Sequence, residues 1–143
     1  MFERSNNFKM AMHYYNQAQS IFESERRSGS IIARVKVDKA NLLFKVNRQK
    51  EARASLSEAS SQSEGLIQAE AMLMQGQTFE YDSEYVQALQ FYETALSVLL
   101  VFSKGKTADS YQIRSYNLLM AKTKYHKGCI QGKVLSGHSL VIF

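Results

Sequence analysis

Apolar side chains recur along the chain at the three- and four-residue spacing of an α-helix. Between Asn6 and Ser24 they run from Phe8 through Tyr15 to Phe22 and mark one face of a helix. The same spacing returns in five further segments, at about 31–44, 50–60, 65–82, 83–102 and 108–126. The pattern predicts an all-α fold.

Short polar runs separate these segments. They are SerGlySer at 28–30, ValAsnArgGln at 46–49, Asp82 with Ser83, and SerLysGlyLysThr at 103–107, while the serine-rich run at 60–65 ends the third helix. Ser30 is expected to cap the second helix, because a serine hydroxyl can accept from the free amides of a first turn. Beyond residue 127 three glycines interrupt the pattern, so we expect an irregular tail over 128–143.

Length and composition favour a single packed domain. The chain has 143 residues, of which 45% are hydrophobic and 22% charged, and it contains no proline. These values are typical of a globular protein and leave long segments free to be helical. We therefore expect one helical domain over residues 1–127, with about two full hairpins and a single helix on each side.

Three of the predicted helices share one pattern of small and large residues. A small residue is followed four positions later by a large one and three positions after that by a second small one. The three sets are Ala11, Tyr15 and Ala18; Ala52, Leu56 and Ala59; and Ala88, Tyr92 and Ala95. The leading alanines are 41 and 36 residues apart, an interval typical of two-helix repeats.

The segment from Ala69 to Phe102 resembles a tetratricopeptide repeat. Gly76 and Phe79 stand at the small and aromatic positions of its first helix, and Tyr85 precedes the alanine pattern of its second. The segment 33–60 resembles the same repeat, with Ala40 as the small residue.

The resemblance covers about residues 7–126. It implies antiparallel hairpins stacked as a short right-handed superhelix, an α-solenoid. The chain departs from the family at Lys36, where a large apolar residue is usual, and it lacks the closing proline. Related helical arrays, such as those of kinase scaffolds or SNAP-type adaptors, give a similar pattern. The unpaired end hairpins suggest a piece of a longer solenoid or a truncated product.

Charge is segregated along the sequence behind a net charge of +5. Residues 26–53 carry nine basic side chains against two acidic ones, residues 54–103 carry seven acidic and no basic ones, and residues 104–143 are basic again. The first basic block could contact phosphate backbones. We favour the alternative of solvated helix faces or contacts between repeats, where the acidic block can neutralise it from hairpin to hairpin, and nucleic acid is not the expected partner.

Residues that could support catalysis or metal binding are few and scattered. Cys129 is the single cysteine, the histidines at 13, 126 and 138 lack metal-ligand spacing, and the SerLysGlyLysThr run lacks the upstream glycine and strand of a phosphate-binding loop. We therefore expect no catalytic residues, no metal, no cofactor and no small-molecule substrate. No signal peptide or continuous apolar span stands out, so a cytoplasmic or nuclear location, away from membranes, is expected.

The resemblance implies a protein-binding scaffold or adaptor, with a peptide or partner helix held on the concave face formed by the first helices of the hairpins. The residues expected on that face are Arg34, Asn41, Lys45, Glu70, Gln77, Glu80, Arg114 and Lys122. Asn41 matches the asparagine with which some family members hold a peptide carboxylate, but the accompanying lysine would fall at Val37.

Because the hairpin that bears Arg34 and Lys45 has a basic surplus, we expect it to contribute more to partner binding than Glu70. The alternatives are a structural segment of a larger multi-subunit assembly and, less favoured, a helical repeat associated with nucleic acid. The unpaired terminal helices predict self-association when the chain is made alone.

Overall fold

The computed structural model describes residues 2–26, 29–105 and 108–135, and this part of the chain contains six helices and no strand. The helices are α1 (Phe2–Ser24), α2 (Gly29–Lys45), α3 (Gln49–Ser61), α4 (Leu66–Tyr81), α5 (Tyr85–Ser103) and α6 (Ser110–Leu135). The all-α prediction is confirmed.

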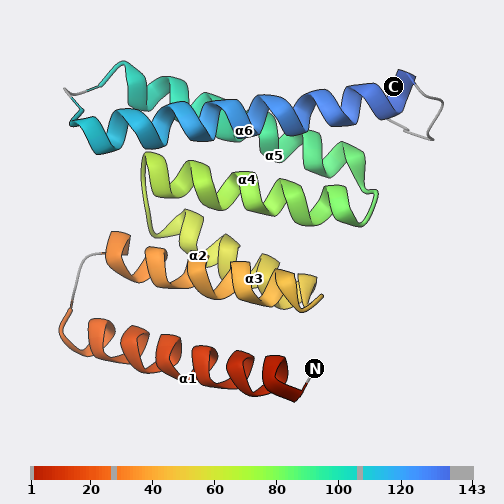
Figure 1. The fold of residues 1–143 in the computed structure, drawn as a ribbon. Coiled ribbons are helices and arrows are strands. Elements are labelled where there is room, and N and C mark those ends of the chain that lie inside the picture. Colours follow the sequence, from red (N-terminus) through yellow and green to blue (C-terminus); the bar gives the residue numbers. More distant parts are fainter. Residues whose placement is uncertain (1, 27–28, 106–107, 136–143) are drawn as a thin grey trace.

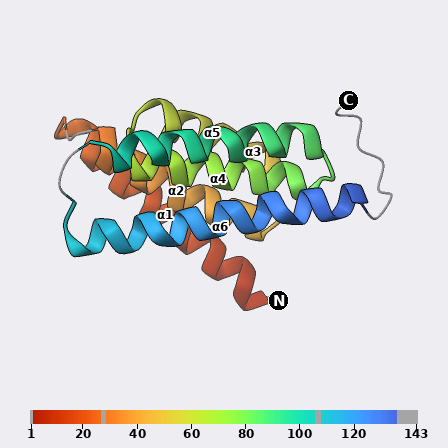
Figure 2. The same ribbon diagram turned by 90° about the horizontal axis from the view of Figure 1, so that it is seen from above.

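Each helix packs against the next one in the sequence, and α4 also contacts both α2 and α6. Figure 1 shows α2, α4 and α6 beginning at the same side and running in one direction, while α1, α3 and α5 run the opposite way. Seen from above, α5 and α6 lie on opposite sides of α4, and the first turns of α1 extend away from the other helices (Figure 2). Three parallel helices therefore lie next to one another, α2 against α4 and α4 against α6.

The turns that join α2 to α3 and α4 to α5 have the same backbone geometry. Asn47 and Ser83, 36 residues apart, each adopt a positive φ, of 64° and 61°. In each turn the next amide donates to a carbonyl five residues back, from Arg48 to Leu43 and from Glu84 to Phe79, both at 2.9 Å. This left-handed cap ends a helix by satisfying its last carbonyls, and here it reverses the chain twice in the same way.

Two apolar clusters form the core. The first joins α2 and α3 through Ala33, Val37 and Leu56 and reaches Ala71 on α4. The second joins α4, α5 and α6 around the fully buried Tyr92. Since α4 contributes to both clusters, it connects the two halves of the core.

The helix boundaries correct two expectations. Ser30 lies inside the first turn of α2, which begins at Gly29, so it is not the cap. The last helix continues to Leu135, past the expected end at His126, so the expected irregular tail is wrong for residues 128–135. Ile130 explains the difference, because its fully buried side chain gains packing energy that offsets the low helix propensity of nearby glycines. Residues 136–143 lie outside the described part of the chain.

Within the described residues, α5 is the helix whose length and mean hydropathy of 1.3 would suffice to cross a membrane. Polar residues such as Gln87, Gln90 and Glu93 interrupt this helix, so it is not a continuous apolar span. Length and composition do not themselves make a membrane span, since core helices pass the same test. Ala88, Tyr92, Ala95 and Leu99 of α5 are fully buried, whereas Leu100 and Val101 are exposed, and 22% of the apolar window is buried.

Candidate functional site

A groove of about 840 Å³ lies where α2, α4 and α6 meet. Five of the eight residues expected on the concave face line it, namely Arg34, Asn41, Glu70, Gln77 and Lys122. The three parallel helices thus bring together side chains that are up to 88 residues apart in the sequence.

Apolar side chains from all three helices form the floor of this groove. Val37, Leu73 and Leu119 line it and are almost completely buried. Met74 and Leu118 extend the apolar lining, and Leu118 remains 54% exposed. A floor of this kind can bury the apolar face of a bound segment, while its polar rim sets the segment's orientation.

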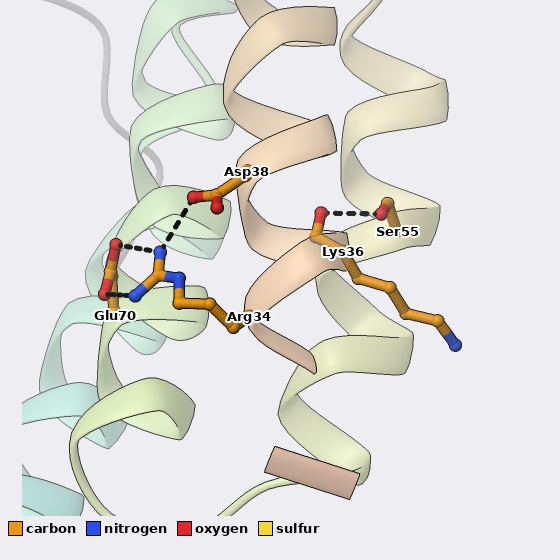
Figure 3. A network of polar contacts seen from close by, with 5 residues as sticks. All are labelled: Arg34, Lys36, Asp38, Ser55 and Glu70. Atoms are coloured by element: carbon orange, nitrogen blue, oxygen red, sulfur yellow. Dashed lines mark hydrogen bonds and ion pairs between the residues drawn. The ribbon is translucent and has the colours of Figure 1, made fainter. Parts of the chain in front are cut away.

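Arg34 on α2 is committed to two carboxylates. Its two terminal nitrogens donate to the two oxygens of Glu70 on α4, each at 2.8 Å, and one of them also donates to Asp38 at 3.1 Å (Figure 3). The hydrogen bonds to Glu70 raise the pKa of Arg34 above its ordinary value. The paired hydrogen bonds between Arg34 and Glu70 join α2 to α4. Because one guanidinium faces the two carboxylates of Glu70 and Asp38, one negative charge is in excess.

Lys36 lies on the side of α2 that faces α3. Its carbonyl accepts from the Ser55 hydroxyl at 2.9 Å, as Figure 3 shows, and its amine lies 2.9 Å from Glu58 on α3. The residue is only 5% exposed, so its aliphatic stem fills the place where the repeat family usually has an apolar side chain. The departure from the family pattern at this position is thus compatible with packing.

Glu80 connects three helices beside the groove. Tyr92 on α5 donates its hydroxyl to Glu80 Oε1 at 2.6 Å, and His126 Nδ1 on α6 donates to the same atom at 3.2 Å. The Gln77 amide donates to His126 Nε2 at 2.9 Å, which places the imidazole proton on Nδ1. Lys133 lies 3.8 Å from Glu80 Oε2. We call these five side chains the Glu80 cluster.

A second hollow, of about 470 Å³, opens at the Glu80 cluster and shares Gln77 with the groove. Glu80, expected on the concave face, lines this hollow and not the groove. Lys45 and Arg114 are exposed and line neither of these two hollows.

Val37 lies in the floor of the groove, one turn from Asn41. The carboxylate-binding pair of the repeat family would need a lysine at Val37, and the buried valine supplies no charge there. Asn41 is exposed at the rim and can offer its amide alone.

Acidic partners neutralise part of the basic block at 26–53. Lys36 pairs with Glu58 within its own hairpin, and two ion pairs reach the acidic block in the next hairpin, Arg34 to Glu70 and Arg53 to Asp82, with distances of 2.8 and 2.6 Å. Arg53 also lies over the Phe79 ring, 3.9 Å from its centroid. The interpretation that neighbouring hairpins neutralise each other is confirmed for these pairs, and the expected basic surplus at Arg34 is wrong because Glu70 and Asp38 both face it.

The residues expected to pack between helices are placed as follows. The sets on α3 and α5, which are Ala52, Leu56, Ala59, Ala88, Tyr92 and Ala95, are completely buried, and so is Ala40. The set on α1, which is Ala11, Tyr15 and Ala18, is half-buried. Gly76 faces the Tyr92 ring, Tyr85 is buried, and Phe79 stacks on Phe91 with 5.5 Å between ring centroids.

Sequence reasoning missed His126 and Lys133 as members of a cluster. The sequence around His126 shows only that metal-ligand spacing is lacking, because its partners Gln77 and Glu80 are 49 and 46 residues away. Lys133 fell in the expected tail. The apolar position of Ile130 three residues before Lys133 was the available signal that the helix continues.

No group of three or more histidine, cysteine, aspartate or glutamate side chains within residues 2–26, 29–105 and 108–135 is placed to hold a metal ion. Cys129 is a free, half-buried thiol on α6. His138 and two residues of the SerLysGlyLysThr run lie outside the described part of the chain. The whole chain matches no protein-family model, no curated protein and no solved structure.

Proposed function

We propose that this chain is a non-catalytic protein-binding scaffold of the tetratricopeptide type, which holds a peptide or partner helix in the groove between α2, α4 and α6. The groove carries this proposal. It is open to solvent, it spans three helices, and its apolar floor is combined with polar groups at the rim. Extended peptides and amphipathic helices bind such surfaces through apolar anchors and a few polar contacts.

The repeat geometry supports the family assignment. The small residues Ala40 and Gly76, the two left-handed turns and the buried sets on α3 and α5 are all offset by 36 residues. Two copies of one helix–turn–helix unit give this constant offset, and stacking such units side by side lines up their first helices along one face. We infer a short right-handed superhelix from it.

Peptide selection tests the function. Peptides are selected by display against the immobilised protein and then bound to it in solution. Hydrogen exchange identifies the backbone amides that the peptide protects, and hydroxyl-radical footprinting identifies the protected side chains. We expect protection on the groove faces of α2, α4 and α6, and loss of binding in Leu118→Ser, which removes an exposed apolar contact without a change in charge. Peptides that protect only other faces, or a selection that yields none, would refute the proposal.

A structural role in a larger assembly is the second candidate, and the exposed apolar face of α1 favours it. Met10, Tyr14 and Ile21 are each more than half exposed and follow helical spacing. If this face is an assembly surface, the chain should self-associate and the substitutions Met10→Ser and Tyr14→Ser should abolish that. A monomer at high concentration in analytical ultracentrifugation would count against this role.

A further inference from the structure

The charges that line the groove have one dominant sign. Among the described residues its charged side chains are Arg34 and Lys122 against Asp38, Glu64, Glu70 and Asp109, a surplus of two carboxylates. The two cations are not equivalent, because Arg34 already donates to Glu70 and Asp38. The formal charges that line the groove therefore sum to −2, although the chain as a whole has a net charge of +5.

The carboxylates are distributed along the groove. Glu64 and Asp109 lie at the end where α4 and α6 begin, while Asp38 and Glu70 lie farther along, beside Arg34. Glu64 is exposed and has no hydrogen-bond or ion-pair partner among the described residues. The Asp109 carboxylate accepts a hydrogen bond from the backbone amide of Gln112 at 2.8 Å and so caps the start of α6. A ligand thus meets negative charge along the rim and apolar side chains on the floor.

From this arrangement we infer that the groove selects a cationic amphipathic segment, a stretch of protein that presents lysine or arginine on one side and large apolar side chains on the other. The inference rests on the proposed function and adds the chemistry of the partner. The apolar side would cover Leu73, Met74 and Leu118, and the cations would face Glu64, Asp38 and Glu70. Surface charge of one sign steers ligands of the other and disfavours those of the same sign.

The same charges argue against two other ligands. A nucleic acid would bring phosphates next to Glu64 and Glu70, where like charges repel. A peptide held by a terminal carboxylate would need a cation in the groove floor, and the floor offers Val37. A DNA oligonucleotide therefore serves as a comparison probe in the test.

The test uses two labelled synthetic peptides of the same length. In the first, lysine and leucine are spaced so that a helix presents lysine on one side and leucine on the other, and in the second glutamate replaces every lysine. Fluorescence anisotropy measures their Kd at 0.05 and 0.5 M salt, with a DNA oligonucleotide as the third probe. We expect the lysine peptide to bind at least tenfold more tightly than the glutamate peptide at low salt. The difference should shrink at high salt because the Debye length falls from above 10 Å to about 4 Å.

Two variants with the same change in charge locate the effect. Glu64→Lys at the groove should weaken the lysine peptide about tenfold. Glu84→Lys, an exposed position at the start of α5 outside the groove, should change its Kd less than twofold. Leu118→Ser should weaken both peptides.

Each outcome bears on one of the two claims. If the glutamate peptide or the oligonucleotide binds as tightly as the lysine peptide and Leu118→Ser still weakens it, the cationic preference is overturned while the groove remains a binding site. If Glu64→Lys and Glu84→Lys act equally, binding follows the overall charge, and the inference is overturned as well. If neither peptide binds at any salt concentration, the proposed function itself fails.

Discussion

Replacing Gly76 by alanine tests how closely α4 and α5 approach each other. An added Cβ would lie 2.7 Å from Cδ1 and 3.0 Å from Cζ of the Tyr92 ring, with Cε1 also in contact. Carbon atoms are at optimal contact at about 3.5–4.0 Å. The ring is poorly able to yield, because Tyr92 is fully buried and its hydroxyl is held by Glu80.

The expected magnitude follows from two opposing effects. Overpacking a core contact costs about 1–3 kcal/mol, and alanine gains back about 1 kcal/mol over glycine inside a helix. Since the Tyr92 ring is fixed at both ends, we expect Gly76→Ala to lower the free energy of unfolding by about 1–2 kcal/mol. Gly76→Leu should lower it further.

Gly128 on α6 provides the matched control. An added Cβ there meets no atom within 4 Å, so the same substitution removes only the low helix propensity of glycine. We expect Gly128→Ala to raise the free energy of unfolding by about 0.5–1 kcal/mol. The two substitutions should therefore have opposite signs in urea denaturation followed by circular dichroism.

A double-mutant cycle with Tyr92→Leu identifies the contact. If the Tyr92 ring is the obstacle, Gly76→Ala should cost clearly less in the Tyr92→Leu background, because residues in contact do not add independently. Stabilisation by Gly76→Ala, or the same cost in both backgrounds, would show that α4 and α5 do not approach each other as described.

Three further predictions concern stability. Ser83→Gly should raise the free energy of unfolding by about 1 kcal/mol, because glycine adopts the φ of 61° without strain; an unchanged urea midpoint would contradict the turn geometry. Lys36→Met should be neutral or mildly stabilising, since it keeps the buried stem and removes a buried amine, whereas Lys36→Ala should cost about 1–2 kcal/mol in the same assay; equal losses for the two variants would mean that the ion pair with Glu58 is what matters. Burial and the hydrogen bond to Glu80 raise the pKa of Tyr92 above its unfolded value of 10.0. The stability that the neutral hydroxyl contributes is therefore complete below pH 10.0 and is lost as the pH rises above it. In thermal unfolding from pH 8 to 11, Tyr92→Phe should lose less stability at alkaline pH than the unchanged protein, and equal losses would contradict this.

The helices could be read from the sequence because their apolar spacing is local. The alanine pattern on α3 and α5 was equally visible, since small residues at fixed offsets are needed wherever two helices approach closely. The extension of α6 was not visible, because glycine is a weak helix former and only the burial of Ile130, a tertiary effect, offsets that.

The sign of the charge in the groove could not be predicted either. Net charge along the sequence assigned a positive surplus to the segment around Arg34, but Glu70 and Asp38 neutralise that side chain in space. Glu64 and Asp109 come from two other segments. Which charges face the same solvent depends on how three distant helices are oriented, and the periodicity of one helix carries no information about the others.

The Glu80 cluster has a consequence for how the protein opens. One carboxylate binds a hydroxyl of α5 and two side chains of α6, so separation of α6 from α4 also exposes the α4–α5 contact. The amides of α4, α5 and the second half of α6 should then exchange with deuterium in a single cooperative event of high free energy. By contrast, α1 packs on α2 as its only neighbouring helix in the described part of the chain, joined there by the 3.0 Å hydrogen bond from Lys39 to Gln19, and its amides should exchange first.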